Sequence, residues 1–157
     1  MILGFKQTIG KKKSGFPNKI ESGVKIHSMR MDPKKRWRVG MKIQLAYYEA
    51  KMKYRLIKEV EVVSIQEVVI KWYDAQCAPV IEIDGRMLWL SEIIALSLND
   101  GFDSVQDFYK YFNMSGVFRL IHWTEFSYDG DGRKMTARTK ELAAFSKEVG
   151  TNYVPWN

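Results

Sequence analysis

The feature that most constrains the fold is the density of β-branched residues between positions 56 and 71, where Val and Ile dominate the apolar positions. Such side chains favour the extended, pleated backbone of a strand. Just upstream, apolar and polar residues alternate from Met41 to Tyr47, which is the period of a strand with one face against a core. We expect a half-buried strand over residues 41–47, followed by one long bent strand or two successive strands over 56–71.

The second half of the chain mixes strand and helix signals. Asp84-Gly85 stands between alternating apolar residues and predicts a tight hairpin. Ser91 is placed to cap a short helix over 92–98, and Ser104 with Asp107 resembles a capping box that opens a helix over 105–113. A strand is expected over 118–126, and a C-terminal helix over 136–149.

The beginning of the chain is rich in Gly and Lys. Residues 1–19 are predicted to form an extended arm or a first strand over 2–6, followed by a loop. A short helical turn ends at Gly23, extended chain follows to Arg30, and Asp32-Pro33 opens a turn. The fold class expected from these elements is α+β, with mixed strands and short flanking helices.

Composition limits the setting of the protein. The 157 residues, 46% of them hydrophobic, suffice for one domain with a core. Cys77 is the only cysteine, and His27 and His122 are the only histidines, so neither an internal disulfide nor a zinc site is expected. No segment has the length of a membrane span. We therefore expect a cytoplasmic protein without a membrane partner or a cofactor.

Charge is divided unevenly along the chain. Residues 1–58 hold 16 Lys and Arg against 3 acidic residues, a net charge of +13, while residues 59–157 carry −6. A basic half of this kind is typical of proteins that bind phosphate-bearing partners. Two alternatives are open: a solvated face that only confers solubility, and a surface that binds an acidic host protein.

Two neighbouring segments, 20–30 and 36–43, place cations and a hydroxyl in extended chain between glycines. This is how a small β-barrel displays charge at its mouth, and it points to an anionic ligand. Trp37, between Arg36 and Arg38, either stacks on a base or folds back into the core. The residues that we expect to contact nucleic acid are Lys11, Lys12, Lys13, Lys25, Arg30, Lys34, Lys35, Arg36, Trp37 and Arg38.

The order of three motifs resembles the ASCH family of PUA-like domains. They are Gly23-Val24-Lys25-Ile26-His27-Ser28-Met29-Arg30, Trp37-Arg38-Val39-Gly40-Met41, and Asn99-Asp100-Gly101-Phe102-Asp103-Ser104. The chain is also similar to small ASCH-like proteins of bacteriophages and prophages. The resemblance implies a PUA-like mixed β-barrel over 20–126. Outside the matching segment we expect a basic arm over 1–19 and a helical extension over 127–157 packed on the same domain.

The resemblance also implies two activities. ASCH and other PUA-like domains bind RNA or modified nucleotides, and some small members are amidohydrolases that remove the acyl group of N4-acetylcytidine. In those hydrolases a Lys, a Thr three residues later and a Glu do the chemistry. Lys25, Ser28 and Asp100 occupy these positions here, so the hydroxyl and the carboxylate are kept on shorter or less constrained side chains.

Elementary chemistry allows the same three residues a second interpretation. A Lys can activate a hydroxyl only if burial or nearby cations lower its pKa. In extended chain Lys25 and Ser28 point to opposite faces, so catalysis requires a bulge or turn between them. Otherwise Lys25 contacts phosphate, Ser28 bonds the backbone and Asp100 forms a turn before Gly101.

Two interpretations are also open for His27 and His122, which either form an acid–base pair or are packed residues. The sequence leaves the oligomeric state open.

Overall fold

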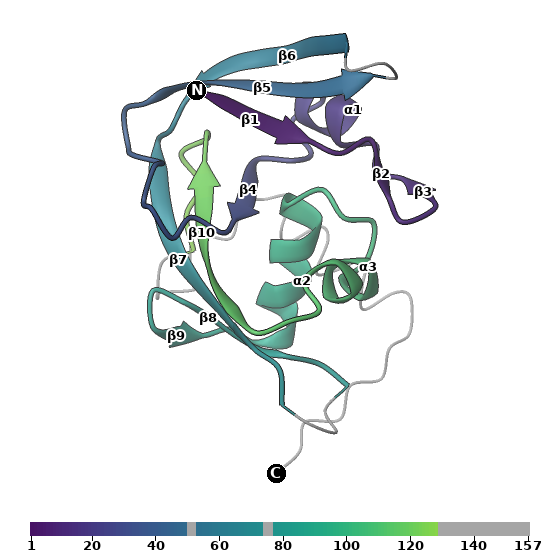
Figure 1. Ribbon diagram of the computed structural model, residues 1–157. Coiled ribbons are helices and arrows are strands. Elements are labelled where there is room, and N and C mark those ends of the chain that lie inside the picture. Colours follow the sequence, from purple (N-terminus) through teal and green to yellow (C-terminus); the bar gives the residue numbers. More distant parts are fainter. Residues whose placement is uncertain (50–52, 74–76, 129–157) are drawn as a thin grey trace. The chain divides into compact units, whose positions relative to one another are not determined.

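The computed structural model describes residues 1–49, 53–73 and 77–128 (Figure 1). The chain divides into two units, Met1–Ser127 and Tyr128–Asn157. All of the helices and strands given below belong to the first unit. The helix predicted over 136–149 lies outside the described residues, as does nearly all of the predicted extension over 127–157.

The first sheet has three strands in the order β1-β5-β6. β1 (Ile2–Phe5) runs parallel to β5 (Lys42–Glu49), which pairs antiparallel with β6 (Lys53–Glu61). Leu3 and Phe5 point into the core, as do Ile43 and Leu45 of β5. The alternation that predicted a strand over 41–47 is therefore confirmed, because it places one face of β5 on the core.

The second sheet has five strands in the order β4-β10-β7-β8-β9, all antiparallel. Their bounds are β4 (His27–Arg30), β7 (Ser64–Lys71), β8 (Val80–Ile83), β9 (Arg86–Met87) and β10 (Gly116–His122). β8 and β9 form the predicted hairpin, whose turn residues Asp84 and Gly85 both have positive φ, as a type I′ turn requires.

The β-branched segment 56–71 forms two strands that belong to different sheets. Val62 donates its backbone N–H to Met41 beside the first sheet, whereas Val63 donates to His122 of the second. The chain thus changes sheets between two consecutive residues. The α+β class is confirmed, but the expected barrel is not closed: within the described ranges each sheet ends in two unjoined edge strands.

Three short helices flank these sheets. α1 (Phe16–Glu21) lies beside β6, and α2 (Leu90–Asn99) packs on α3 (Val105–Tyr111) (Figure 1). Ser104 caps α3 by accepting the N–H of Asp107 at 3.1 Å, as predicted. The predicted Ser91 cap is wrong, because α2 begins at Leu90, two residues before the predicted start. Its N-cap is Trp89, whose N–H donates to the Glu92 carboxylate at 2.9 Å.

The predicted basic arm carries regular structure. After β1, β2 (Thr8–Ile9) and β3 (Lys12–Lys13) form a two-stranded hairpin that turns at Gly10 and Lys11. Ser14 fixes the base of this hairpin, because its N–H donates to Gln7 and its hydroxyl donates to Lys6. Lys11, Lys12 and Lys13 are therefore presented on a defined hairpin of the N-terminal segment.

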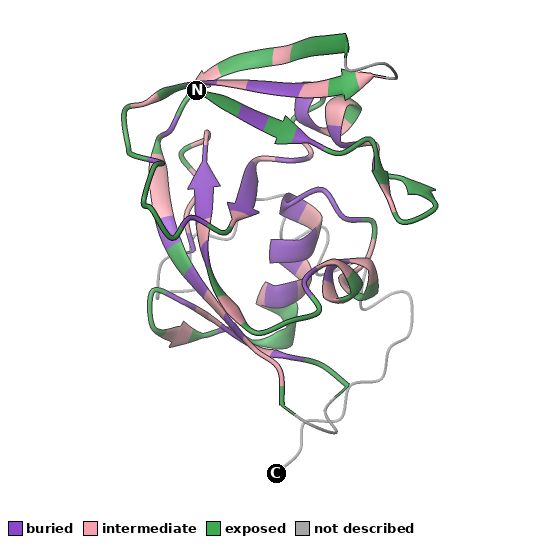
Figure 2. Ribbon diagram, viewed as in Figure 1, coloured by how far each residue is buried: buried purple, intermediate pink, exposed green. Residues whose placement is uncertain are grey.

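Burial is concentrated where the sheets and α2 meet, as the purple residues of β4, β10 and α2 show in Figure 2. The core includes Val68, Ile81, Leu96, Phe108 and Leu120, each fully buried. In the part of the chain that the structure describes, no helix combines the length and apolar character needed to cross a membrane.

A Schellman motif ends α2 and sets the path of the next segment. Gly101 donates its N–H to Leu98, and Phe102 donates to Ser97. Gly101 has φ +89°, and a Cβ built on it would lie 3.0 Å from the Lys25 side chain and 3.1 Å from the Phe16 ring. Only glycine meets both the conformational and the spatial requirement.

We predict that Gly101→Ala destabilises the fold more than Gly10→Ala. Both glycines have positive φ, which costs an alanine roughly 1–2 kcal/mol. A Cβ at Gly10 meets nothing within 4 Å, whereas a Cβ at Gly101 must displace buried atoms. Urea denaturation of both variants measures the difference. Equal losses of stability would show that the packing against Lys25 and Phe16 is not tight.

Candidate functional site

Lys25 is carried into the interior by the turn that ends α1. Gly23, at φ +71°, reverses the chain, and the N–H groups of Val24 and Lys25 both donate to Lys19. Ile26 then donates to the carbonyl of Asn99 at 3.0 Å, which fixes this segment to the end of α2. The Lys25 side chain is consequently 1% exposed.

Asp100 meets Lys25 at the C-terminal end of α2. The Lys25 Nζ lies 2.8 Å from Asp100 Oδ1 and also donates to the Asp100 carbonyl. A cation is favourable at this end of a helix, where backbone carbonyls lack intrahelical partners. The ammonium also lies 4.8 Å from the centre of the Phe16 ring and 5.4 Å from that of Phe5. Lys25 and Asp100 therefore form an ion pair inside an aromatic enclosure.

Burial and pairing act in opposite directions on these two groups. Burial lowers the pKa of Lys25 from its usual 10.5 to about 8, although the Asp100 carboxylate favours the charged form. Burial alone would raise the pKa of Asp100, but the charge of Lys25 and a hydrogen bond from His27 bring that pKa below its usual value. At pH 7 the pair is ionised, with a lysine closer than usual to neutrality.

His27 is the third member of this buried group. Its Nδ1 lies 3.5 Å from Asp100 Oδ1, and its ring packs edge-on against that of His122, with the ring centres 5.2 Å apart. The two histidines are paired across β4 and β10, and both are fully buried. Burial lowers the pKa of His27 and lowers that of His122 to about 2, so both rings are neutral at pH 7.

The structure does not bring Ser28 to Lys25 and Asp100. β4 pairs with β10 in continuous register, so Ser28 and His27 point to opposite faces of the sheet. Among the described residues, no hydrogen bond joins Ser28 to either partner of the ion pair. Arg30, two residues on, donates to the carbonyl of Gly4 at 2.8 Å and lies over the Phe5 ring, and so holds β1 in place.

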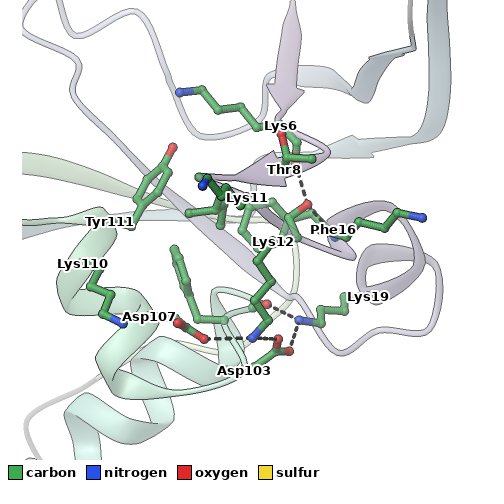
Figure 3. Close-up of a pocket in the computed structure, with 16 residues that line it drawn as sticks. Lys6, Thr8, Lys11, Lys12, Phe16, Lys19, Asp103, Asp107, Lys110 and Tyr111 are labelled. Carbon is green, nitrogen blue, oxygen red and sulfur yellow. Dashed lines mark hydrogen bonds and ion pairs between the residues drawn. The ribbon is translucent and has the colours of Figure 1, made fainter.

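A pocket of about 610 Å³ lies beside this buried group (Figure 3). The β2–β3 hairpin, α1, the segment after α2, and α3 all contribute to it. Phe16 and Gly101 line the pocket and also contact Lys25, so they separate the pocket from the ion pair. Its polar side chains are Lys6, Thr8, Lys11, Lys12, Lys13, Ser14, Lys19, Asp103, Asp107, Lys110 and Tyr111.

Two of the six pocket lysines are neutralised by acidic groups. Lys12 lies 2.7 Å from Asp103 and 3.1 Å from Asp107, and Lys19 lies 2.6 Å from Asp103. Hydrogen bonds from Lys12, and then from Lys19, lower the pKa of Asp103. Within the described part of the chain, no ion pair is formed by the other four, which are Lys6, Lys11, Lys13 and Lys110.

The predicted basic loop lies elsewhere. Figure 1 draws the connection from β4 to β5 on the left and the β2–β3 hairpin on the right. Asp32 holds this loop, because its carboxylate accepts the Trp37 N–H at 3.1 Å. Trp37 is 9% exposed, so its ring is packed in the core rather than displayed. The exposed cations of the loop are Lys34, Lys35, Arg36 and Arg38.

Sequence reasoning paired Lys25 with Asp100 correctly but missed His27 as their neighbour. The signal was present, because residues two apart in extended chain share a face, and Lys25 and His27 have that spacing. It also missed Lys6, Lys19 and Lys110, which only the tertiary fold gathers around the hairpin. The described residues contain no group of three or more His, Cys, Asp or Glu side chains placed to hold a metal ion.

Comparison with known proteins found no match to this chain among protein-family models, curated proteins or solved structures.

We predict strong coupling between Lys25 and Asp100 in a double-mutant cycle. Asp100→Leu leaves a buried, unpaired ammonium and should cost about 3–5 kcal/mol of unfolding free energy. Adding Lys25→Met removes that charge, so the double variant should be less destabilised than the sum of the two single variants. Urea denaturation measures all four proteins.

The partly exposed pair of Lys71 and Glu82, at 2.6 Å, provides the control, because water reaches both side chains. The same type of cycle there should give about 0–1 kcal/mol of coupling, because solvent screens the charges. Additive losses of stability at Lys25 and Asp100 would contradict a buried ion pair.

Proposed function

We propose that this protein binds RNA or a nucleotide through phosphate groups, in the pocket beside the β2–β3 hairpin. The observation that carries the proposal is that six lysines line one pocket of about 610 Å³, and four of them form no ion pair within the described residues. Ammonium groups that lack an internal counter-ion attract anions, and phosphate is the common polyvalent case.

The charge of the chain supports the same ligand class. Five of the six pocket lysines come from residues 1–58, where the net charge is +13. The exposed cations of the 34–38 loop lie away from the pocket, so in this proposal they raise the rate of encounter and do not fix the ligand.

The resemblance to the ASCH family also supports this function. As part of the proposal, the two sheets correspond to an open form of the PUA-like fold. A PUA-like barrel would place Lys25, Ser28, Arg30, Trp37 and Asp100 along one cleft. Here four of these side chains are at most 9% exposed, so the accessible binding surface is the adjacent pocket. A role as a phage or prophage accessory protein fits the same resemblance.

Lys11→Gln combined with Lys13→Gln should weaken binding of a 20-nucleotide oligouridylate. The salt dependence should also fall, by about 0.7 in the slope of log K against log salt for each phosphate that the variant no longer neutralises. Fluorescence anisotropy at several salt concentrations measures both quantities.

Lys53→Gln with Lys58→Gln is the matched control, since it removes the same charge from exposed positions of β6. The proposal fails if the wild type does not bind at 50 mM salt, or if the two double variants are indistinguishable.

A second candidate is hydrolysis of an N4-acylated cytidine, and the buried Lys25 favours it. A lysine with a pKa of about 8 can accept a proton near neutral pH. Because Ser28 faces away, water is the nucleophile in this scheme: its proton passes to neutral Lys25, its oxygen bonds the acyl carbon, the C–N bond breaks, and the proton ends on the leaving nitrogen. The wall at Phe16 and Gly101 must open for this to occur, since Lys25 is 1% exposed.

For this candidate we expect turnover of N4-acetylcytidine to rise as pH passes through about 8, because only deprotonated Lys25 acts as the base. Lys25→Ala and Asp100→Asn should abolish turnover, and product formation followed by chromatography measures it. No turnover of several acylated nucleosides by the folded wild type would exclude the candidate.

A further inference from the structure

The aromatic ring of Tyr111 is a fixed wall of the pocket. Its centre lies 5.5 Å from that of Phe102 and 4.9 Å from that of Phe112, and both neighbours are buried. Tyr111 itself is only half-buried and lines the pocket. A ring that is held on one side by packing and open on another loses little freedom when a flat ligand stacks on it.

Only some of the lysines around this ring form ion pairs with carboxylates. Figure 3 shows Tyr111 and Lys110 on one side of the pocket, and Lys12 and Lys19 on the other with Asp103 between them. The carboxylates of Asp103 and Asp107 offset Lys12 and Lys19 and would repel a phosphate there. An anion is therefore directed to the lysines that these carboxylates do not engage.

Size limits what can enter. A volume of about 610 Å³ lies in the range of sites for small molecules and cofactors, about 300–1,000 Å³. Stacking on Tyr111 also requires a base with a free face, which a duplex does not offer. The ligand that satisfies both conditions is one unpaired nucleotide.

We propose that the pocket holds a single unpaired nucleotide, with its base stacked on Tyr111 and its phosphate on Lys6 and Lys11. This proposal rests on the proposed function and specifies that the recognised unit is one nucleotide. Stacking accepts any base, because every base has a π face. The pocket therefore selects single-stranded over double-stranded nucleic acid, and not a particular base.

The test uses calorimetric titration of the full chain with uridine 5′-monophosphate and, separately, with inorganic phosphate. Tyr111→Leu should weaken binding of the nucleotide about tenfold or more, as removal of one base–aromatic stack predicts, and leave binding of phosphate unchanged. Tyr111→Phe retains the ring and should bind the nucleotide as the wild type does. Lys6→Gln with Lys11→Gln should weaken both ligands.

Several results would overturn the proposal. The first is the absence of nucleotide binding up to millimolar concentration. The second is an unchanged affinity in Tyr111→Leu. The third is a loss of affinity in a Lys34→Gln, Lys35→Gln variant but not in the Lys6→Gln, Lys11→Gln variant. If the mononucleotide does not bind but oligouridylate still does, this inference fails and the proposed function stands. If neither binds, both fail.

Discussion

The buried ion pair between Lys25 and Asp100 is the interaction on which the rest of the structure depends. It joins the connection between α1 and β4 to the C-terminal end of α2, where the ammonium contacts both the carboxylate and the carbonyl of Asp100. Because both groups are removed from water, neither can lose its partner without a large cost. Two glycines with positive φ, at positions 23 and 101, allow the chain to bring these two groups together. Phe16 packs against the Lys25 ammonium.

The same interaction separates two environments with different chemistry. On the inner side, Asp100 faces Lys25 and His27 in a buried enclosure, and burial lowers the pKa of both bases. On the outer side, Lys19 binds the carbonyl of Gly101 and the carboxylate of Asp103, which belong to the wall of the lysine pocket. The segment from Asp100 to Asp103 thus contributes to both the interior and the surface. The proposed phosphate binding would use the outer side as it stands, whereas the proposed hydrolysis would require access to the inner one.

Local patterns predicted much of the fold, and tertiary arrangement decided the site. Alternation predicted β5, Asp84-Gly85 predicted the β8–β9 turn, and Ser104 predicted the start of α3, because each signal depends on residues close in sequence. Local patterns could not show that the chain changes sheets at Val62 and Val63, which leaves the predicted barrel unclosed. Nor could they show that Ser28 stays on the far face of a regular strand. Whether Lys11, Lys12 and Lys13 bind nucleic acid stays a prediction.

Mapping of a bound oligouridylate by backbone amide chemical shifts tests the central claim most directly, because it reports every part of the surface at once. We predict that the largest shifts fall on residues 6–14 and 101–111, which surround the pocket, with small changes at the exposed loop 34–38. The contrary result, with the largest shifts at 34–38 and none around the β2–β3 hairpin, would show that the lysine pocket is not where nucleic acid binds.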